Sequence, residues 1–162
     1  MRRQHTILIC VLALIVLLAV ATLVWYNRAP SRVQEHGSIT VTMCPQCEQT
    51  FLSLLRGGGD IECALYDYGP EVEQALRAAN ARVVTDDEDG GNYGKPIEQD
   101  GLMHNKFCVI NKTIVTSGSY NPTANGKLNR NNLLVIESPT LARNYNAQYT
   151  AIATGWPRAD RK

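Results

Sequence analysis

The sequence lacks a large excess of charge of either sign. Its 16 Lys and Arg residues stand against 15 Asp and Glu residues, which leaves a formal net charge of +1. A protein dedicated to duplex nucleic acid carries a clear basic excess, so the composition excludes strong non-specific affinity of that kind. The chain also lacks the length for two domains, because about 125 residues remain after the first 37, which suffices for one core.

Histidine is scarce, and of the three present only His104 has a lysine two residues later. Lys106 is followed by Gly118, Ser119 and Asn121 in the same short stretch. An imidazole can attack a phosphorus atom, and an ammonium can neutralise phosphate charge. A hydroxyl and an amide can donate to the remaining phosphoryl oxygens. The residue types therefore predict a phosphate site that contains a nucleophile.

The local pattern around these residues predicts a strand, a tight turn and a second strand. Polar and apolar side chains alternate over 102–110, with the histidine, the lysine and Cys108 on one face. Asn111-Lys112 suits the turn, and the β-branched run 113–117 suits the returning strand. Gly118 allows a sharp bend, so the serine and the asparagine are expected to return beside the histidine.

Together these residues resemble the signature of the phospholipase D superfamily, H-x-K-x4-D-x6-G-S-x-N, at every spacing and in every residue but one. Asn111 stands where the family has Asp. A second segment, NRNN before an apolar run, is similar to the family's N-x-E-N, with Asn131 in place of the Glu that supports the catalytic histidine. The preceding run, CALYDYGPEVEQALRAANARVVTDD, resembles single-motif members such as small bacterial nucleases and mitochondrial cardiolipin hydrolases.

The resemblance implies an α/β fold for residues 38–156, a phospholipase D-like mixed sheet flanked by helices. It also implies a metal-independent phosphodiesterase without a cofactor. Because the family brings two motifs face to face and this chain carries one, a homodimer is implied. One histidine would form a phosphohistidine, and its counterpart would protonate the leaving oxygen before water resolves the intermediate. The implied site residues are His104, Lys106, Ser119, Asn121 and Asn131.

The amino-terminal segment predicts contact with a membrane. Residues 6–26 are almost purely apolar and long enough to span the hydrocarbon core, so a single transmembrane helix within a signal-anchor over 1–26 is expected. The small residues of Ala19-Val20-Ala21 leave open a cleaved signal and a secreted domain. Flanking charges favour an extracytoplasmic domain, with an outer mitochondrial membrane anchor facing the cytosol as the alternative. A linker over 27–37 and a polar tail over 157–162 complete the expected organisation.

Three functions are consistent with these patterns. Resemblance to small nucleases favours an endonuclease, and the membrane segment favours a cardiolipin-type phospholipase. The third is a phosphate-binding or scaffold protein that has lost turnover through Asn111 and Asn131. An Asn oxygen can accept from an imidazole but carries no charge, and in serine proteases the analogous change costs about ten-thousandfold in rate. Asn111 is expected to act as a brace in the turn instead.

The cysteines fall into two groups. Cys44 and Cys47 form a C-P-Q-C sequence between an expected strand and an expected helix, which predicts a disulfide if the domain is extracytoplasmic. The same layout is typical of thioredoxin-like redox domains, which is the alternative. Cys63 and Cys108 lie in apolar runs and are expected in the core, and a zinc site would need two ligands beyond one such pair.

Spacing and turn residues predict the remaining elements. The connection 88–101, rich in glycine, is expected to be a mobile rim over the site that replaces a helix and strand of relatives. The expected strands are 38–43, 61–66, 81–85, 102–110, 113–117 and 132–137, and the expected helices are 48–55, 70–79 and 141–154.

Overall fold

The computed structural model describes residues 14–20, 37–86, 90–97 and 101–155. The chain divides into two compact units, residues 1–34 and 35–162. In the first unit, residues 14–20 form a helix. Among the described residues no helix has the length and apolar character needed to cross a bilayer. The rest of the expected anchor, the linker up to residue 36 and the tail over 157–162 lie outside the described residues.

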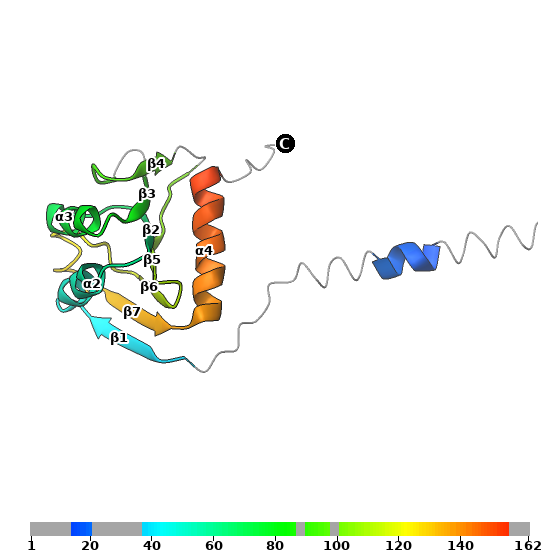
Figure 1. The fold of residues 1–162 in the computed structure, drawn as a ribbon, viewed down its shortest axis with the longest axis horizontal. Coiled ribbons are helices and arrows are strands. Elements are labelled where there is room, and N and C mark those ends of the chain that lie inside the picture. Colours follow the sequence, from blue (N-terminus) through cyan, green and yellow to red (C-terminus); the bar gives the residue numbers. More distant parts are fainter. Residues whose placement is uncertain (1–13, 21–36, 87–89, 98–100, 156–162) are drawn as a thin grey trace, which may run out of the picture. The chain divides into compact units, whose positions relative to one another are not determined.

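The second unit is built on a mixed sheet with strand order β1-β7-β6-β5-β2-β3-β4 (Figure 1). β2, β3 and β4 run parallel, whereas β2 pairs with β5, β5 with β6, β6 with β7 and β7 with β1 in antiparallel fashion. The prediction of a mixed α/β sheet is thus confirmed. The strands are β1 (Ile39–Met43), β2 (Ile61–Leu65), β3 (Arg82–Asp86), β4 (Lys95–Ile97), β5 (Lys106–Ile110), β6 (Ile114–Gly118) and β7 (Asn132–Glu137).

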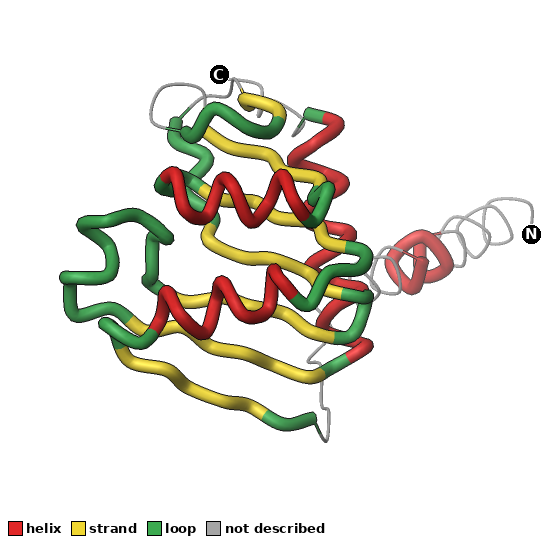
Figure 2. Tube along the Cα trace, turned by 60° about the vertical axis from the view of Figure 1, so that its left-hand side comes forward, coloured by secondary structure: helices red, strands yellow, loops and turns green. Residues whose placement is uncertain are grey.

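Three helices cover the sheet, each within two residues of its predicted bounds. α2 (Cys47–Arg56) and α3 (Pro70–Ala78) lie on one face, and α4 (Pro139–Thr154) lies on the other (Figure 2). α3 begins with a proline in its first turn, where the missing N–H is not needed. α4 starts earlier than predicted because the Ser138 side chain accepts from the Leu141 amide at 2.9 Å and caps the helix.

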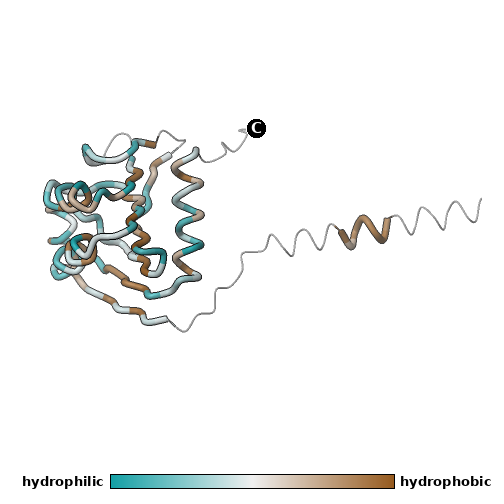
Figure 3. Tube along the Cα trace, in the orientation of Figure 1, coloured by the Kyte–Doolittle hydropathy of each residue, from teal (hydrophilic) through white to brown (hydrophobic). Residues whose placement is uncertain are grey.

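Alternate strand residues divide between two apolar cores. Cys108 and Ile110 of β5 pack with α2 and α3, whereas Phe107 and Val109 pack with α4. Figure 3 shows apolar segments along the central strands between the two helical layers. Successive side chains of a strand point to opposite faces of the sheet. Because both faces of these strands are covered by apolar cores, polar side chains are found at the strand ends.

Two predictions for the region before the signature were wrong. The connection 88–101 contains β4, which pairs parallel with β3, so the expected loop contributes a seventh strand. The strand predicted over 102–110 begins only at Lys106. Its neighbour β2 ends at Leu65, opposite Lys106, so residues further back lack a full ladder partner and His104 lies just outside the strand.

The centre of the sheet carries a cross-strand disulfide. Cys63 and Cys108 face each other in the β2–β5 register, and their sulfur atoms are bonded. Both residues are completely buried, as their apolar runs predicted. The sequence-based interpretation treated them as free core residues and missed the bond. Only the register, which the sequence does not give, places the two Cα atoms 4.1 Å apart.

Candidate active site

The predicted site residues come together where five strand ends meet. β2 and β6 end at this edge of the sheet, and β5 and β7 begin there, because each antiparallel partner reverses the direction of the chain. β1 ends at the same edge, with Met43 opposite Asn132. His104 and Lys106 precede and open β5, Ser119 follows β6, and Asn131 precedes β7. The topology therefore gathers residues that are up to 27 positions apart in the chain.

The backbone on both sides of His104 is fixed by hydrogen bonds. The Met103 amide donates to Oδ2 of Asp86 at 2.8 Å, and the Met103 side chain is 1% exposed. On the other side, the Tyr66 amide donates to the carbonyl of Asn105 at 2.8 Å. His104 itself is exposed. A solvent-accessible imidazole on a firmly held backbone is suited to act as a nucleophile toward a large substrate.

His104, Lys106 and Tyr66 form one cluster. The Tyr66 and His104 rings lie edge to face, with centroids 4.7 Å apart. Nζ of Lys106 donates to the His104 carbonyl at 3.1 Å and lies 5.2 Å from the centroid of the Tyr66 ring, a cation–π distance. Partial burial lowers the pKa of Lys106 below its ordinary value. The ammonium is therefore less well solvated than a surface lysine and is available to an incoming phosphate.

Ser119 is held by two amides at the start of β7. Its Oγ lies 2.9 Å from Oδ1 of Asn132 and 3.2 Å from Oδ1 of Asn131, and it accepts from the Asn132 amide at 3.2 Å. Gly118 makes the approach possible, since its φ is 142° and a Cβ there would lie 2.3 Å from the Asn132 carbonyl oxygen. The Ser119 hydroxyl has one proton, so it can donate to a phosphoryl oxygen only if it gives up its hydrogen bond to these amide oxygens.

Asn131 does not contact the imidazole that it was expected to support. Its Nδ2 donates to the Gly126 carbonyl at 2.9 Å, and its Oδ1 serves Ser119. The predicted hydrogen bond to His104 is absent from the structure. The Asn side chain is one carbon shorter than Glu, and the loop carbonyl of Gly126 satisfies its donor. Asn131 therefore organises the serine and the loop rather than the histidine.

Asn121 presents its amide group to the same loop. Its Oδ1 is buried and accepts no hydrogen bond. No hydrogen bond engages its Nδ2 either, so this donor is free for a phosphoryl oxygen, which is the role that the motif predicts.

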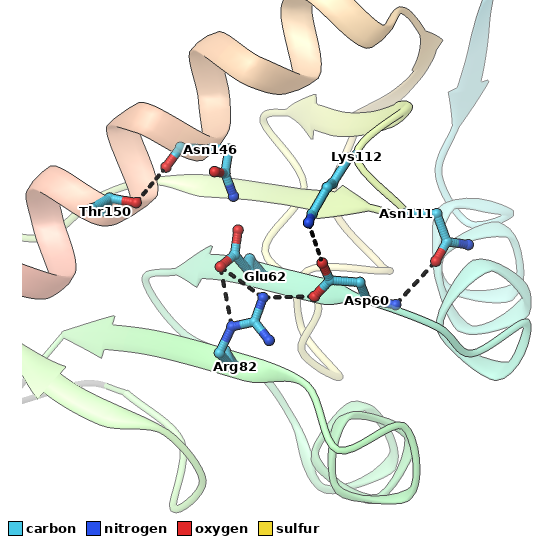
Figure 4. Close-up of polar contacts among 7 residues, drawn as sticks. All are labelled: Asp60, Glu62, Arg82, Asn111, Lys112, Asn146 and Thr150. Carbon is cyan, nitrogen blue, oxygen red and sulfur yellow. Dashed lines mark hydrogen bonds and ion pairs between the residues drawn. The ribbon is translucent and has the colours of Figure 1, made fainter.

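The two Asn departures from the family signature have different structural roles. Asn111 lies in the β5–β6 turn, at the end of the sheet opposite His104, with a φ of 52°. Its Oδ1 accepts from the Asp60 amide at 3.0 Å (Figure 4). Asn tolerates this left-handed backbone well, so the residue braces the turn as expected.

The basic side chains along the motif lie at both ends of β5 and β6. Lys112 lies 3.5 Å from Asp60 in the turn, far along the strand from Lys106, and Asp60 also pairs with Arg82 at 2.6 Å (Figure 4). The Arg82 guanidinium holds the pKa of Asp60 below its usual value. Lys127 pairs with Glu48 at 3.0 Å near the site. Lys106, Lys127 and Arg130 therefore carry the positive charge at the end of the sheet that holds the site.

The Cys44-Pro-Gln-Cys47 segment adjoins Asn131. The structure has a disulfide between Cys44 and Cys47, and the Cys44 amide donates to the Asn131 carbonyl at 3.0 Å. This bond links the end of β1 to the start of β7. The CPQC turn consequently supports the backbone that carries the serine-binding amides.

The arrangement offers an imidazole, an ammonium, a hydroxyl and an amide at one accessible edge of an α/β sheet. Within the described ranges no group of three or more His, Cys, Asp and Glu side chains could hold a metal ion. The donors match the charge and the oxygens of a phosphodiester. The fold and the site thus define a phosphodiester-handling domain of the His-x-Lys class.

Comparison with known protein families identifies the superfamily to which this domain belongs. The family described as the cardiolipin synthase, PLD-like domain, matches residues 61–153, which is more than half of the chain. The protein belongs to the phospholipase D superfamily, in the branch that carries a single H-x-K motif. The resemblance seen in the sequence is confirmed.

Individual relatives are distant. The chain is 26% identical over 118 residues to mitochondrial cardiolipin hydrolase of Xenopus tropicalis, in a match that covers 60% of this chain and 56% of that protein. The chain thus spans about half the length of that relative. The fold is similar to Nuc, a phospholipase D family member from Salmonella typhimurium (TM-score 0.65, 21% identity, 74% of this chain and 95% of that chain). It is also similar to NucT from Helicobacter pylori (TM-score 0.61, 14% identity, 74% and 97%).

Three residues of the site were missed from the sequence. Asp86 directly follows the strand predicted over 81–85 and was given no role, yet it is 2% exposed and holds Met103. Tyr66 was assigned to the end of a strand without a role, and Asn132 to the start of another. Asn132 directly follows Asn131 and could have been noticed as a second amide. The contacts of Asp86 and Tyr66 with the motif depend on the β2–β3 and β2–β5 pairings.

Proposed function

We propose that the protein cleaves phosphodiester bonds in nucleic acid, without a metal ion, through a phosphohistidine on His104. The observation that carries the proposal is the exposed imidazole on a fixed backbone, beside the Lys106 ammonium. Membership of the phospholipase D superfamily supports phosphodiester chemistry. The resemblance to small nucleases favours nucleic acid as the diester.

The chemistry requires two histidines. A ring nitrogen of His104 attacks phosphorus, the bond from phosphorus to the leaving oxygen breaks, and that oxygen needs a proton. Water then attacks phosphorus, a base takes its proton, and the phosphorus–nitrogen bond breaks to restore the imidazole. One histidine cannot serve as nucleophile and acid in the same step. The acid, and later the base, would be His104 of the partner subunit.

The rim of the site is suited to a second copy of the chain. Leu102 lies two residues before His104 and is 56% exposed, and Leu128 in the loop between β6 and β7 is 79% exposed. Both residues belong to segments that leave the sheet at the catalytic edge. Burial of both in a symmetric contact would bring the two imidazoles to a shared axis.

A lipid substrate is the second candidate. It is favoured by the apolar segment 6–26, which would hold the domain at a bilayer, and by the similarity to mitochondrial cardiolipin hydrolase. In that case the same histidine would attack the phosphodiester of a head group. The membrane anchor and an extracytoplasmic location are part of this proposal.

The test uses the full chain with chelator present and compares labelled DNA, RNA and cardiolipin. We expect His104→Ala to lower the rate by at least about a thousandfold, because the nucleophile is lost. His36→Ala, which removes a histidine outside the motif, is the matched control and should leave the rate unchanged. Cleavage of cardiolipin alone would favour the lipid substrate, and activity retained by His104→Ala would rule out the phosphohistidine.

The shared site has a separate test. Differently tagged wild-type and His104→Ala chains can be co-expressed, and the mixed dimer can be purified through both tags. If each reaction needs one nucleophile and one acid, the mixed dimer should be almost inactive. Half of the wild-type rate would show that each subunit works alone.

A further inference from the structure

A pocket adjoins the site on the side of α2 and α3. It has a volume of about 190 Å³ and is enclosed by the first residues of α3, by Glu48 of α2 and by the loop 122–127. In Figure 1 the yellow part of the chain, which includes this loop, lies between α2 and α3. The Gly69 amide donates to the Pro122 carbonyl at 2.8 Å and joins the two walls.

The pocket lies at the same edge of the sheet as the predicted catalytic residues, because α2 follows the end of β1, α3 follows the end of β2 and the loop follows the end of β6. Pro122 directly follows Asn121, the last residue of the signature. Gly69 lies three residues after Tyr66, whose ring packs on His104. The pocket and the predicted catalytic residues are thus built from neighbouring segments of the chain.

The walls combine apolar faces with both signs of charge. Pro70, Val72 and Pro122 provide apolar surface, and the Glu48 carboxylate pairs with Lys127 at 3.0 Å. Glu71 adds a second carboxylate and is exposed. A ligand that fits such walls is flat and apolar on its faces, with hydrogen-bond donors and acceptors on its edge. A quaternary ammonium group would instead favour an aromatic cage, and no aromatic side chain lines the described walls.

Two residues before the loop wall, the Tyr120 side chain carries a hydroxyl without a partner. Tyr120 is 3% exposed, and its OH makes no hydrogen bond. Burial, followed by the charges of Glu48 and Glu71, raises the Tyr120 pKa, so the hydroxyl stays protonated and close to the carboxylates that line the pocket.

We infer that this pocket is a nucleobase subsite, which receives the base next to the scissile phosphate. The inference rests on the proposed phosphodiesterase function and names its substrate class. The apolar walls cover the faces of the base, Glu71 accepts from its amino groups and Lys127 donates to its ring or carbonyl acceptors. A base can enter only when it is unstacked, so single-stranded nucleic acid is the preferred substrate.

The test is a binding cycle that does not depend on turnover. Fluorescence anisotropy measures the affinity of the full-length wild type and Ala124→Trp for a single-stranded 12-mer and for the same strand with abasic positions. Ala124 is exposed on the loop and lines the pocket, so tryptophan there fills the space. We expect the wild type to bind the base-containing strand roughly tenfold more tightly than the abasic strand, and Ala124→Trp to bind both equally.

Matched controls separate the pocket from the loop. Asn125→Trp alters an exposed neighbour that does not line the pocket, and it should preserve the tenfold preference. Glu71→Ala keeps the loop intact and should reduce the preference. If the wild type binds both strands equally, the pocket is not a nucleobase subsite. The same conclusion follows if cardiolipin vesicles displace the oligonucleotide from the wild type but not from Ala124→Trp.

A second substrate separates a wrong assignment of the pocket from a wrong assignment of the hydrolysis reaction. Methyl p-nitrophenyl phosphate is a diester without a base, and its cleavage depends on His104 but not on the pocket. If the wild type does not cleave it and no nucleic acid is cut, the proposed hydrolysis is wrong while the binding cycle remains decisive for the pocket. If Ala124→Trp slows both substrates alike, the pocket has no role in recognising the base.

Discussion

Lys106 differs from the other lysines around the site in its surroundings. It is half-buried beside the Tyr66 ring, whereas Lys112 at the opposite end of β5 is exposed in a turn. Burial without a carboxylate partner disfavours the charged form, which explains the lowered pKa of Lys106. A bound phosphate favours the charged form of Lys106 again, because the ammonium pairs with the negative phosphoryl oxygens, most strongly in the transition state.

The lowered pKa of Lys106 predicts how kcat/KM changes at alkaline pH. Only the ammonium form of Lys106 binds phosphate, so kcat/KM should fall as pH rises through the lowered pKa, with a midpoint below the ordinary 10.5. Lys106→Arg should move that midpoint above about 12, since a guanidinium stays charged. Lys112→Arg is the control and should leave it in place. An unchanged alkaline limb in Lys106→Arg would assign the titration to another group.

Single side chains also show where sequence reasoning stops. The motif spacing was enough to predict His104, Lys106, Ser119 and Asn121 at one edge of the sheet. It was not enough to show that Asn131 bonds to Ser119 and Gly126 rather than to the imidazole. Side-chain hydrogen bonds depend on distances of tenths of an ångström between segments that are remote in sequence. A pattern of residue types does not contain these distances.

The CPQC turn between β1 and α2 acts on the site through backbone contacts. Its disulfide closes a loop of only three residues in sequence separation, whereas the central disulfide spans 45. In the chain-entropy description, the short loop contributes about 1 to 2 kcal/mol to the free energy of unfolding and the long one about 4 kcal/mol. The Cys44–Cys47 bond is therefore a weak contributor to stability that is close to Asn131.

Removal of the Cys44–Cys47 bond should separate activity from stability. We expect the double variant Cys44→Ser, Cys47→Ser to lose roughly tenfold in kcat/KM, because the Asn131 backbone and the serine that depends on it are less well held. Its free energy of unfolding in urea should fall by no more than about 2 kcal/mol. The matched variant Cys63→Ala, Cys108→Ala should show the larger loss in stability. Unaltered kinetics in the first variant would contradict the positioning role.

The elements themselves were largely predictable, with one informative exception. Helices and strands near the signature follow from hydrophobic period and from Pro, Gly and Ser at their ends. β4 was not predicted because a three-residue strand has too few residues to show a period. It exists because β3 offers it a free edge, which is a property of the tertiary structure. The late start of β5 also depends on tertiary structure, because β2 ends opposite Lys106 and offers no full ladder partner further back.

At the level of the assembly, Leu128 has the most exposed large apolar side chain among the described residues. If it lies in the interface between two copies, Leu128→Asp should raise the dimer dissociation constant at least tenfold, because a charge replaces buried apolar surface. Sedimentation velocity over a range of concentrations measures this constant. Activity should fall in parallel, since each site needs both subunits.

The control for this prediction lies on β1. Ile39 is 64% exposed at the end of β1 away from the site, so Ile39→Asp introduces the same charge without reaching the catalytic edge. We expect its dimerisation and activity to match the wild type. An equal effect of both substitutions would place the contact between subunits along β1 instead.

The bond between Cys63 and Cys108 makes the chain between them a closed covalent ring. Tyr66, which follows β2, and His104, which precedes β5, both belong to this ring, and so does the connection around Gly90–Gly94. A protease that cuts this connection once would produce two polypeptides that remain joined at the centre of the sheet. The nicked protein would migrate as one species until it is reduced, and Tyr66 would stay beside His104 although no continuous backbone connects them in that direction.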